Sequence, residues 1–234
     1  MGVDRARRAR DGDMLVLGLL GGAGQASARV GSIFGDGEID TKSYAAGATL
    51  TWLGADGDYI DGRAQATWFD SKLTSSVLGT LTDGKDGHGR AYSVEAGRRW
   101  PAGDGLALTP QVQMVYSKVD FDSFAGPAGT VVKAGRGDSL ASRVGISLDR
   151  RSTSGHLYGI ASVRREWRAG TTADVSGTPI ARRNQRLWGE FGLGASMLLG
   201  ERLFLYAELA ADTALRDFGK SYGFKGAASL RLAF

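Results

Sequence analysis

Apolar and polar residues alternate with a period of two along most of this chain of 234 residues. In the last segment, apolar side chains take the even positions from Tyr222 to Phe234, while Lys225 and Arg231 take odd positions. This pattern predicts a β-strand with one apolar and one polar face. Its repetition favours an all-β architecture in which each strand separates an apolar medium from a polar one.

About ten segments alternate in this way, each about ten residues long, which is the length that a tilted strand needs to cross a bilayer. We predict one domain, 1–234, with strands at residues 14–24, 43–53, 59–70, 90–100, 105–118, 138–150, 157–168, 186–199, 202–215 and 221–234. The connections alternate between short turns at 54–58, 101–105, 152–156 and 200–202 and long loops at 25–42, 71–89, 119–137 and 169–185. This asymmetry is typical of outer-membrane proteins, so the sequence predicts an antiparallel transmembrane up-and-down β-barrel.

The beginning of the chain leaves two interpretations open for residues 14–28. An apolar run at 14–23 follows a basic cluster at 5–10 and precedes Ala26, Ser27 and Ala28, a pattern similar to a signal peptide. Asp11 and Asp13 at the edge of the run favour a strand instead. Both interpretations direct the chain to the cell envelope. No apolar run reaches the roughly 18 residues of a transmembrane helix.

Composition excludes several classes of function. The net charge is +4, but Lys and Arg are scattered singly beyond the first ten residues, so we expect no nucleic-acid partner. Cysteine is absent, and the two histidines, His88 and His156, fall in a predicted loop and a predicted turn. Too few residues are present for a catalytic triad or a zinc site. We therefore expect no enzymatic activity, no cofactor and no metal.

The five tryptophans fall at the ends of predicted strands. Trp52 and Trp100 lie at the short-turn side, and Trp68, Trp167 and Trp188 lie at the long-loop side. Aromatic girdles at both membrane interfaces would produce this distribution. Trp188 is the weakest member because it has the same parity as Glu190.

Several stretches resemble, in the same order, the β-domain of the autotransporter family. They are residues 2–5 (GVDR), 59–62 (YIDG), 108–113 (LTPQVQ), 119–124 (VDFDSF), 137–140 (GDSL), 143–145 (RVG), 190–194 (EFGLG) and the closing strand. The resemblance covers nearly the whole chain. It implies a barrel of twelve strands with an N-terminal helix in the lumen, and an N-terminal passenger that is carried to the cell surface.

The resemblance also implies an assembly signal in the last strand, which the barrel-assembly machinery recognises. Phe224, Leu230, Leu232 and Phe234 correspond to it, with Leu232 in place of the usual aromatic residue. Residues 2–5 correspond to the end of the family's second strand. We therefore expect a shortened chain that lacks the helix, the first strand, most of the second strand and the passenger.

Alternation places a set of charged residues on the face opposite to the apolar one, where we expect them to line the lumen. They are Arg63, Glu95, Arg143, Glu166, Glu190, Glu208 and Arg231. One interpretation is a network that holds a luminal helix and shapes the pore. The other is an ordinary solvated barrel interior. Both stay open at this point.

The resemblance favours a translocator in the bacterial outer membrane that exports and anchors a covalently linked passenger. Outer-membrane lipid and the barrel-assembly machinery are the other expected partners, and we expect a monomer. The alternative is a standalone small barrel whose surface loops have an adhesive or structural role. A soluble β-sandwich is disfavoured by the terminal Phe234 and by the tryptophan distribution.

Overall fold

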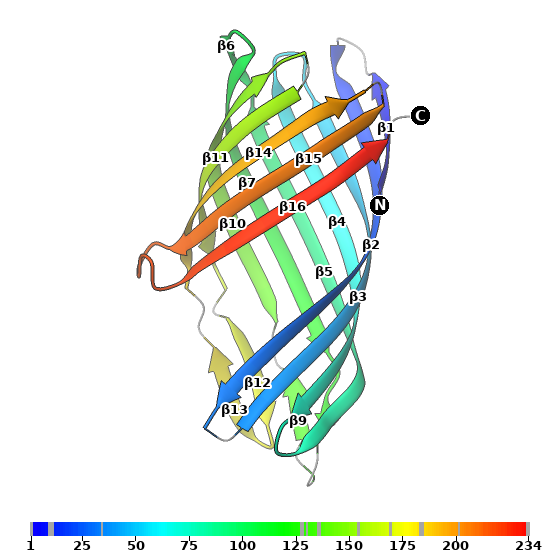
Figure 1. Ribbon diagram of the computed structural model, residues 1–234, viewed down its shortest axis with the longest axis vertical. Helices are drawn as coiled ribbons and strands as arrows, with labels where there is room; N and C mark the ends of the chain where they lie inside the picture. Colours follow the sequence, from blue (N-terminus) through cyan, green and yellow to red (C-terminus); the bar gives the residue numbers. More distant parts are fainter. Residues whose placement is uncertain are drawn as a thin grey trace.

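The computed structural model describes residues 2–8, 12–33, 35–126, 129, 131–134, 137–153, 155–168, 170–182, 185–200 and 202–232. Most of them belong to one large antiparallel sheet, which curls around an open interior (Figure 1). Its strands are ordered along the chain: β1 (Gly2–Arg8), β2 (Met14–Ser32), β3 (Gly35–Leu53), β4 (Asp58–Ser75), β5 (Gly79–Arg98), β7 (Leu106–Phe121), β10 (Asp138–Arg151), β11 (Gly155–Glu166), β14 (Leu187–Leu199), β15 (Leu203–Ala214) and β16 (Tyr222–Leu232). The short β6 (Trp100–Gly103) pairs with β7. This architecture confirms the predicted all-β, antiparallel barrel class.

The large aliphatic side chains of the sheet lie mainly on its outer face. In β10, Val144, Ile146 and Leu148 are 63%, 44% and 53% exposed, whereas Asp149 is only 6% exposed. Among the described residues, the hydrophobic residues that are buried are small alanines, not large aliphatic side chains. A soluble protein distributes these residues in the opposite way. The exposed apolar wall is the surface that a barrel presents to lipid.

The regions 25–42 and 71–89 are not loops, contrary to the sequence prediction. Residues 14–32 form β2, which pairs with β3 without a break from Met14 opposite Leu53 to Ser32 opposite Gly35. Likewise, β4 and β5 remain paired as far as Ser75 opposite Gly79. The alternation of apolar and polar residues ends where these strands extend out of the apolar medium. Pairing between strands continues, because backbone hydrogen bonds do not require apolar side chains. The strands therefore extend beyond the segments that hydrophobicity marks.

Exposed ion pairs join the extended parts of these hairpins. Arg29 Nε lies 3.2 Å from Glu38 Oε1, and Lys72 Nζ lies 2.8 Å from Asp83 Oδ2. The hydrogen bond between Lys72 and Asp83 raises the pKa of the lysine and lowers the pKa of the aspartate. Both partners are solvated, so the pair contributes little to stability.

The regions 119–137 and 169–185 also contain strands that alternation did not indicate. Four short strands form a second sheet in the order β13-β12-β9-β8. They are β8 (Phe124–Ala125), β9 (Val131–Ala134), β12 (Thr171–Val175) and β13 (Thr178–Arg182). Two reciprocal bonds connect the regions: Ser176 N donates to Val131 O (2.8 Å), and Val131 N donates to Ser176 Oγ (3.2 Å). These strands are too short to be recognised singly, and the pairing of β9 with β12 joins regions that are distant in sequence.

The two ends of the barrel differ. Short turns and the end of β16 lie at one end, and the long hairpins and the four-stranded sheet lie at the other (Figure 1). One short turn depends on Gly105, whose φ is 76°. A Cβ at this position would collide with the carbonyl oxygen of Arg151 in the neighbouring turn. The described residues include no helix of sufficient length and apolarity to cross a membrane.

Candidate functional site

Contacts between strands that are not direct neighbours identify the inner face of the sheet. Neighbouring strands lie about 4.8 Å apart, so second neighbours are roughly twice as distant. Only on a concave face do side chains lean together enough to cross this distance. Arg143 on β10 reaches Glu95 on β5 and Glu190 on β14, and each of these strands is two positions away from β10. These residues therefore lie on the inner wall.

Arg143 is the centre of the charged cluster on this wall. Its Nη2 lies 2.7 Å from Glu95 Oε2, and its Nη1 lies 3.7 Å from Glu190 Oε1. The three side chains are 22%, 17% and 20% exposed, so they are largely removed from bulk solvent. Tyr59 donates a hydrogen bond of 2.8 Å to the other oxygen of Glu95. The sequence placed all three charged residues on one face, and the structure brings them into direct contact.

The cluster continues towards the last strand through Lys225. Its Nζ lies 3.2 Å from Glu190 Oε2 and 3.5 Å from Asp212 Oδ1. The predicted set did not include Lys225, Asp212 or Tyr59. Lys225 and Asp212 have the parity of the polar face, so alternation alone could have identified them as inner-wall residues. Tyr59 has an amphipathic side chain that hydrophobic alternation does not classify.

A second group surrounds Glu208. Tyr206 donates a hydrogen bond of 2.5 Å to Glu208 Oε2, and Tyr158 donates to the same oxygen. The two tyrosine hydroxyls are also 2.9 Å apart. The residues come from β11 and β15, with β14 between them. Together with the Arg143 cluster, this group makes the inner wall polar over β4 to β16.

The two tyrosine rings cover glycines of the neighbouring strand. Tyr59 is the register partner of Gly97, and Tyr158 is the register partner of Gly194. A Cβ on either glycine would overlap the ring of its tyrosine. An aromatic ring that covers a cross-strand glycine compensates for the side chain that the glycine lacks. The two glycines therefore position the hydroxyl groups that bind Glu95 and Glu208.

We predict that Gly194→Val displaces Tyr158 and breaks its bond to Glu208. Overpacking of this kind costs about 1–3 kcal/mol. The measurement is the unfolding free energy of the barrel in detergent or vesicles. Gly22→Val is the matched control, because Gly22 lies within β2 and a Cβ there would meet nothing within 4 Å. Equal effects of the two substitutions would contradict the proposed role of Gly194.

The remaining predicted luminal residues differ in their surroundings. Arg63 has inner-face parity and makes no ion pair with the residues that the structure describes. Glu166 lies at the end of β11 and accepts hydrogen bonds from Ser139 Oγ (2.5 Å), Leu140 N (3.1 Å) and Arg168 N (2.9 Å). It therefore fixes the local chain and takes no part in the Arg143 cluster. The Arg231 side chain lies outside the described residues.

An additional charged group, absent from the predicted set, lies at the short-turn end. Asp149 is largely buried and lies 3.1 Å from Arg99 Nη2. Arg151 and His156 are more distant, at 3.8 Å and 3.4 Å from the same carboxylate oxygen. The sequence placed His156 in a turn, whereas it lies at the beginning of β11. The contact of Arg99 with Asp149 joins the segment between β5 and β6 to the end of β10.

Four of the five tryptophans occupy exposed positions or strand ends. Trp68, Trp100 and Trp167 are 47%, 50% and 49% exposed. Trp52 is partly covered and donates a hydrogen bond of 3.0 Å to Asp13. Trp188 has the parity of Glu190, and the Arg164 guanidinium lies 5.8 Å from its ring centroid. Since Trp188 faces inwards, it does not belong to an outer girdle. The interfacial role of the other four stays a prediction.

The residues of the expected assembly signal lie on the outer face of β16, as far as the structure describes them. Phe224, Leu230 and Leu232 are 78%, 68% and 57% exposed. Phe234 lies outside the described residues. Their recognition during assembly stays a prediction.

Comparisons with known proteins agree with this geometry. The family model described as the autotransporter beta-domain matches residues 1–210. The chain is 38% identical over 217 residues to the adhesin BmaC autotransporter of Brucella suis biovar 1 (strain 1330), covering 88% of this chain and 6% of that protein. It is 26% identical over 225 residues to the probable autotransporter YfaL of Escherichia coli (strain K12), covering 93% of this chain and 18% of that protein. The chain thus spans a small part of the length of these relatives.

Solved structures show the same fold at low sequence identity. The transport unit of the autotransporter AIDA-I from Escherichia coli has a TM-score of 0.87 and 18% identity, covering 100% of this chain and 80% of that one. The translocator domain of NalP from Neisseria meningitidis has a TM-score of 0.72 and 19% identity, covering 100% of this chain and 79% of that one. In both cases the similarity extends over the entire curled sheet.

Proposed function

The chain belongs to the autotransporter β-domain family, and we propose that it exports a covalently linked N-terminal passenger through its lumen and then anchors it. It is an outer-membrane translocator barrel, and its family is one of translocators and not of enzymes. We assign no catalytic step to it. The export proposal depends on the contrast between the two faces of one sheet, of which the outer is apolar and the inner is charged.

The polar inner wall supports passage of an unfolded segment. An extended chain carries unpaired backbone N–H and C=O groups, which an apolar conduit would leave without partners. The Arg143 cluster and the tyrosines around Glu208 supply donors and acceptors on the wall. Ion pairs and hydrogen bonds among these residues hold them on the wall. In this proposal, export is driven by folding of the passenger outside the cell and not by a nucleotide.

Surface exposure of the passenger tests this function. The complete reading frame that encodes this chain is expressed with an epitope in the segment before the barrel, and intact cells are treated with a protease. We expect loss of the epitope while the folded barrel persists. An epitope that remains protected in cells with a folded barrel would overturn the export proposal.

We further propose that the barrel-assembly machinery recognises the last strand, including Phe234. Phe234→Ser should strongly reduce the amount of heat-modifiable barrel in outer-membrane fractions, because the terminal aromatic residue corresponds to the assembly signal. Phe218→Ser is the matched control, since Phe218 is 77% exposed and lies in the turn before β16. Normal assembly of the Phe234 variant would remove the assignment of the signal. If the Phe234→Ser variant assembles normally, its passenger should also be exposed at the cell surface as in the unmodified protein.

A further inference from the structure

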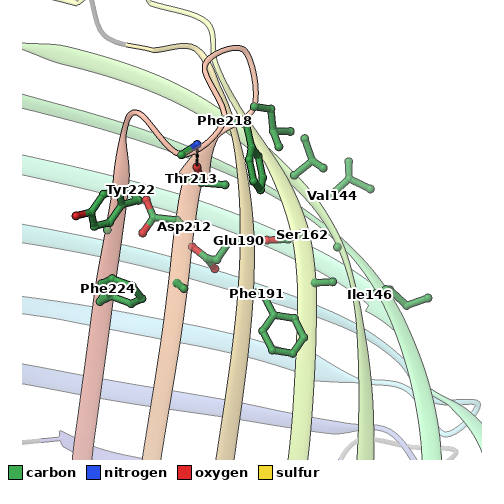
Figure 2. A pocket seen from close by; sticks show the side chains of 18 of the residues that line it. Val144, Ile146, Ser162, Glu190, Phe191, Asp212, Thr213, Phe218, Tyr222 and Phe224 are labelled. Atoms are coloured by element: carbon green, nitrogen blue, oxygen red, sulfur yellow. Dashed lines mark hydrogen bonds between the residues drawn. The ribbon is translucent and has the colours of Figure 1, made fainter.

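A large depression interrupts the outer wall near the end that carries the long hairpins (Figure 2). Its volume is about 920 Å³, and it extends across β10, β11, β14, β15 and β16. Small residues contribute to its floor: Ala161 and Ala211 take the outward positions on either side of Phe191, and Gly189 takes an outward position in the next row. Most of its lining residues take outward positions, so the depression lies on the lipid-facing surface; Ser162, Glu190 and Asp212, whose parity is that of the inner wall, also border it.

Large apolar side chains border this floor. Figure 2 shows Val144 and Ile146 on one side and Tyr222 and Phe224 on the other, with Phe191 between them. In register, one outward row runs from Val163 through Gly189 and Thr213 to Tyr222. Three strand intervals separate the ends of this row, which corresponds to roughly 14 Å. We call this depression, from Val144 to Phe224, the apolar groove.

An apolar groove in a membrane does not select an occupant by itself. Lipid chains are as apolar as leucine side chains, so filling the groove with one particular lipid gains no hydrophobic free energy. Selection requires a second feature that distinguishes headgroups. The residues immediately beyond the groove, at its long-hairpin end, supply this feature.

Four basic residues come from the strand ends and the turn that border this end of the groove. Arg165 follows Val163 on the outward face of β11 and is the register partner of Leu187. Its guanidinium carbon lies 4.2 Å from the centroid of the Trp167 ring, which holds the side chain at the interface. Arg186 precedes β14, and Arg216 and Lys220 lie in the connection between β15 and β16. All four basic residues are exposed.

These four positive charges are not neutralised locally. None of them forms an ion pair with a carboxylate among the residues that the structure describes. Asp217, which is adjacent to Arg216 in sequence, accepts a hydrogen bond of 2.7 Å from Gln185, and Glu166, which is adjacent to Arg165, accepts hydrogen bonds from Ser139, Leu140 and Arg168. An excess of arginine at a membrane interface is complementary to phosphate, which guanidinium groups bind with two parallel hydrogen bonds.

We propose that the apolar groove and this basic end bind one phosphorylated, multiply acylated lipid of the outer leaflet. The acyl chains lie on the floor of Ala161, Gly189 and Ala211, and the phosphates face Arg165 and Arg216. Phe218, from the turn that carries Arg216, lies at the upper end of the groove and covers the chains near the headgroup (Figure 2). The orientation of the site towards the outer leaflet rests on the proposed function.

Native mass spectrometry of the full chain, purified from outer membranes in mild detergent, tests this site. Bisphosphorylated lipid A is the probe, and phosphatidylcholine and dephosphorylated lipid A are the comparison lipids. We expect one molecule of bisphosphorylated lipid A to be retained in preference to both. Because each basic residue near a charged lipid surface contributes about 1 kcal/mol, Arg165→Gln with Arg216→Gln should weaken retention by roughly ten-fold or more.

Two further variants test the contribution of the apolar groove to lipid retention separately from that of the basic residues. Ala211→Phe fills the floor and should also weaken retention, whereas Ala64→Phe, on the outward face of β4, is the matched control and should not. Equal retention of all three lipids, or retention unaffected by both the double variant and Ala211→Phe, would overturn the proposal. Heat modifiability of the same samples reports barrel assembly separately. Loss of lipid preference in a fully assembled barrel therefore contradicts this site and leaves the translocator function intact.

Discussion

Leu209→Arg is expected to destabilise the barrel by about 2–4 kcal/mol, the cost of arginine on the lipid face near the bilayer midplane. Leu209 lies near the middle of β15 (Leu203–Ala214) and is 72% exposed on the outer wall. Its register partners are Leu193 and Gly226, so neither neighbour can neutralise a cation. The measurement is the free energy of unfolding in phospholipid vesicles, from denaturant titration.

Ala227→Arg provides the opposite-face control for this substitution. Ala227 lies on β16 opposite Glu208, on the inner wall. An arginine there meets water and a carboxylate, so we expect a change within about 0.5 kcal/mol. If both arginines destabilised the barrel equally, the assignment of outer and inner faces would be wrong. If neither did, the outer face would not contact lipid.

The sequence predicted the fold class and the face of most charged residues, because both follow from a local period of two. Glu95, Arg143 and Glu190 have the parity that the structure requires. Their mutual contacts could not be predicted in the same way. The side chain of Arg143 forms its ion pairs with residues of β5 and β14 and not with those of the adjacent β7 and β11, and this choice depends on curvature and strand stagger. These properties belong to the whole sheet.

Loop structure was the weakest part of the sequence prediction, for a related reason. Outward apolar residues mark only the part of a strand that contacts the apolar medium. β2 and β3 continue past the predicted ends, where polar residues such as Arg29 and Glu38 take the outward positions. The sheet that joins β9 to β12 depends on pairing between regions about forty residues apart, which no local pattern encodes. The pairing of Tyr158 with Gly194 was missed similarly, since cross-strand partners are known only once register is known.

Arg143→Met is expected to cost about 2 kcal/mol, because it leaves two partly buried carboxylates without their cation. Removing one member of a fully buried pair costs about 3–5 kcal/mol, and we reduce this because a hydrated lumen screens the charges. Glu95 and Glu190 are 17% and 20% exposed, so the penalty is smaller than in a dry core but not negligible. Unfolding in vesicles measures the loss.

Two comparisons decide whether this loss comes from the charges. Arg63→Met removes an inner-wall arginine that has no ion pair among the described residues, so it should change stability by less than about 0.5 kcal/mol. Adding Glu95→Gln and Glu190→Gln to Arg143→Met should recover more than half of the loss, since neutral amides need no counter-ion. Tyr59 can still bond to the amide at position 95, and Lys225 retains Asp212. No recovery in the triple variant would mean that Arg143 stabilises the wall through packing of its aliphatic stem, and the inner charges would then be an ordinary solvated interior.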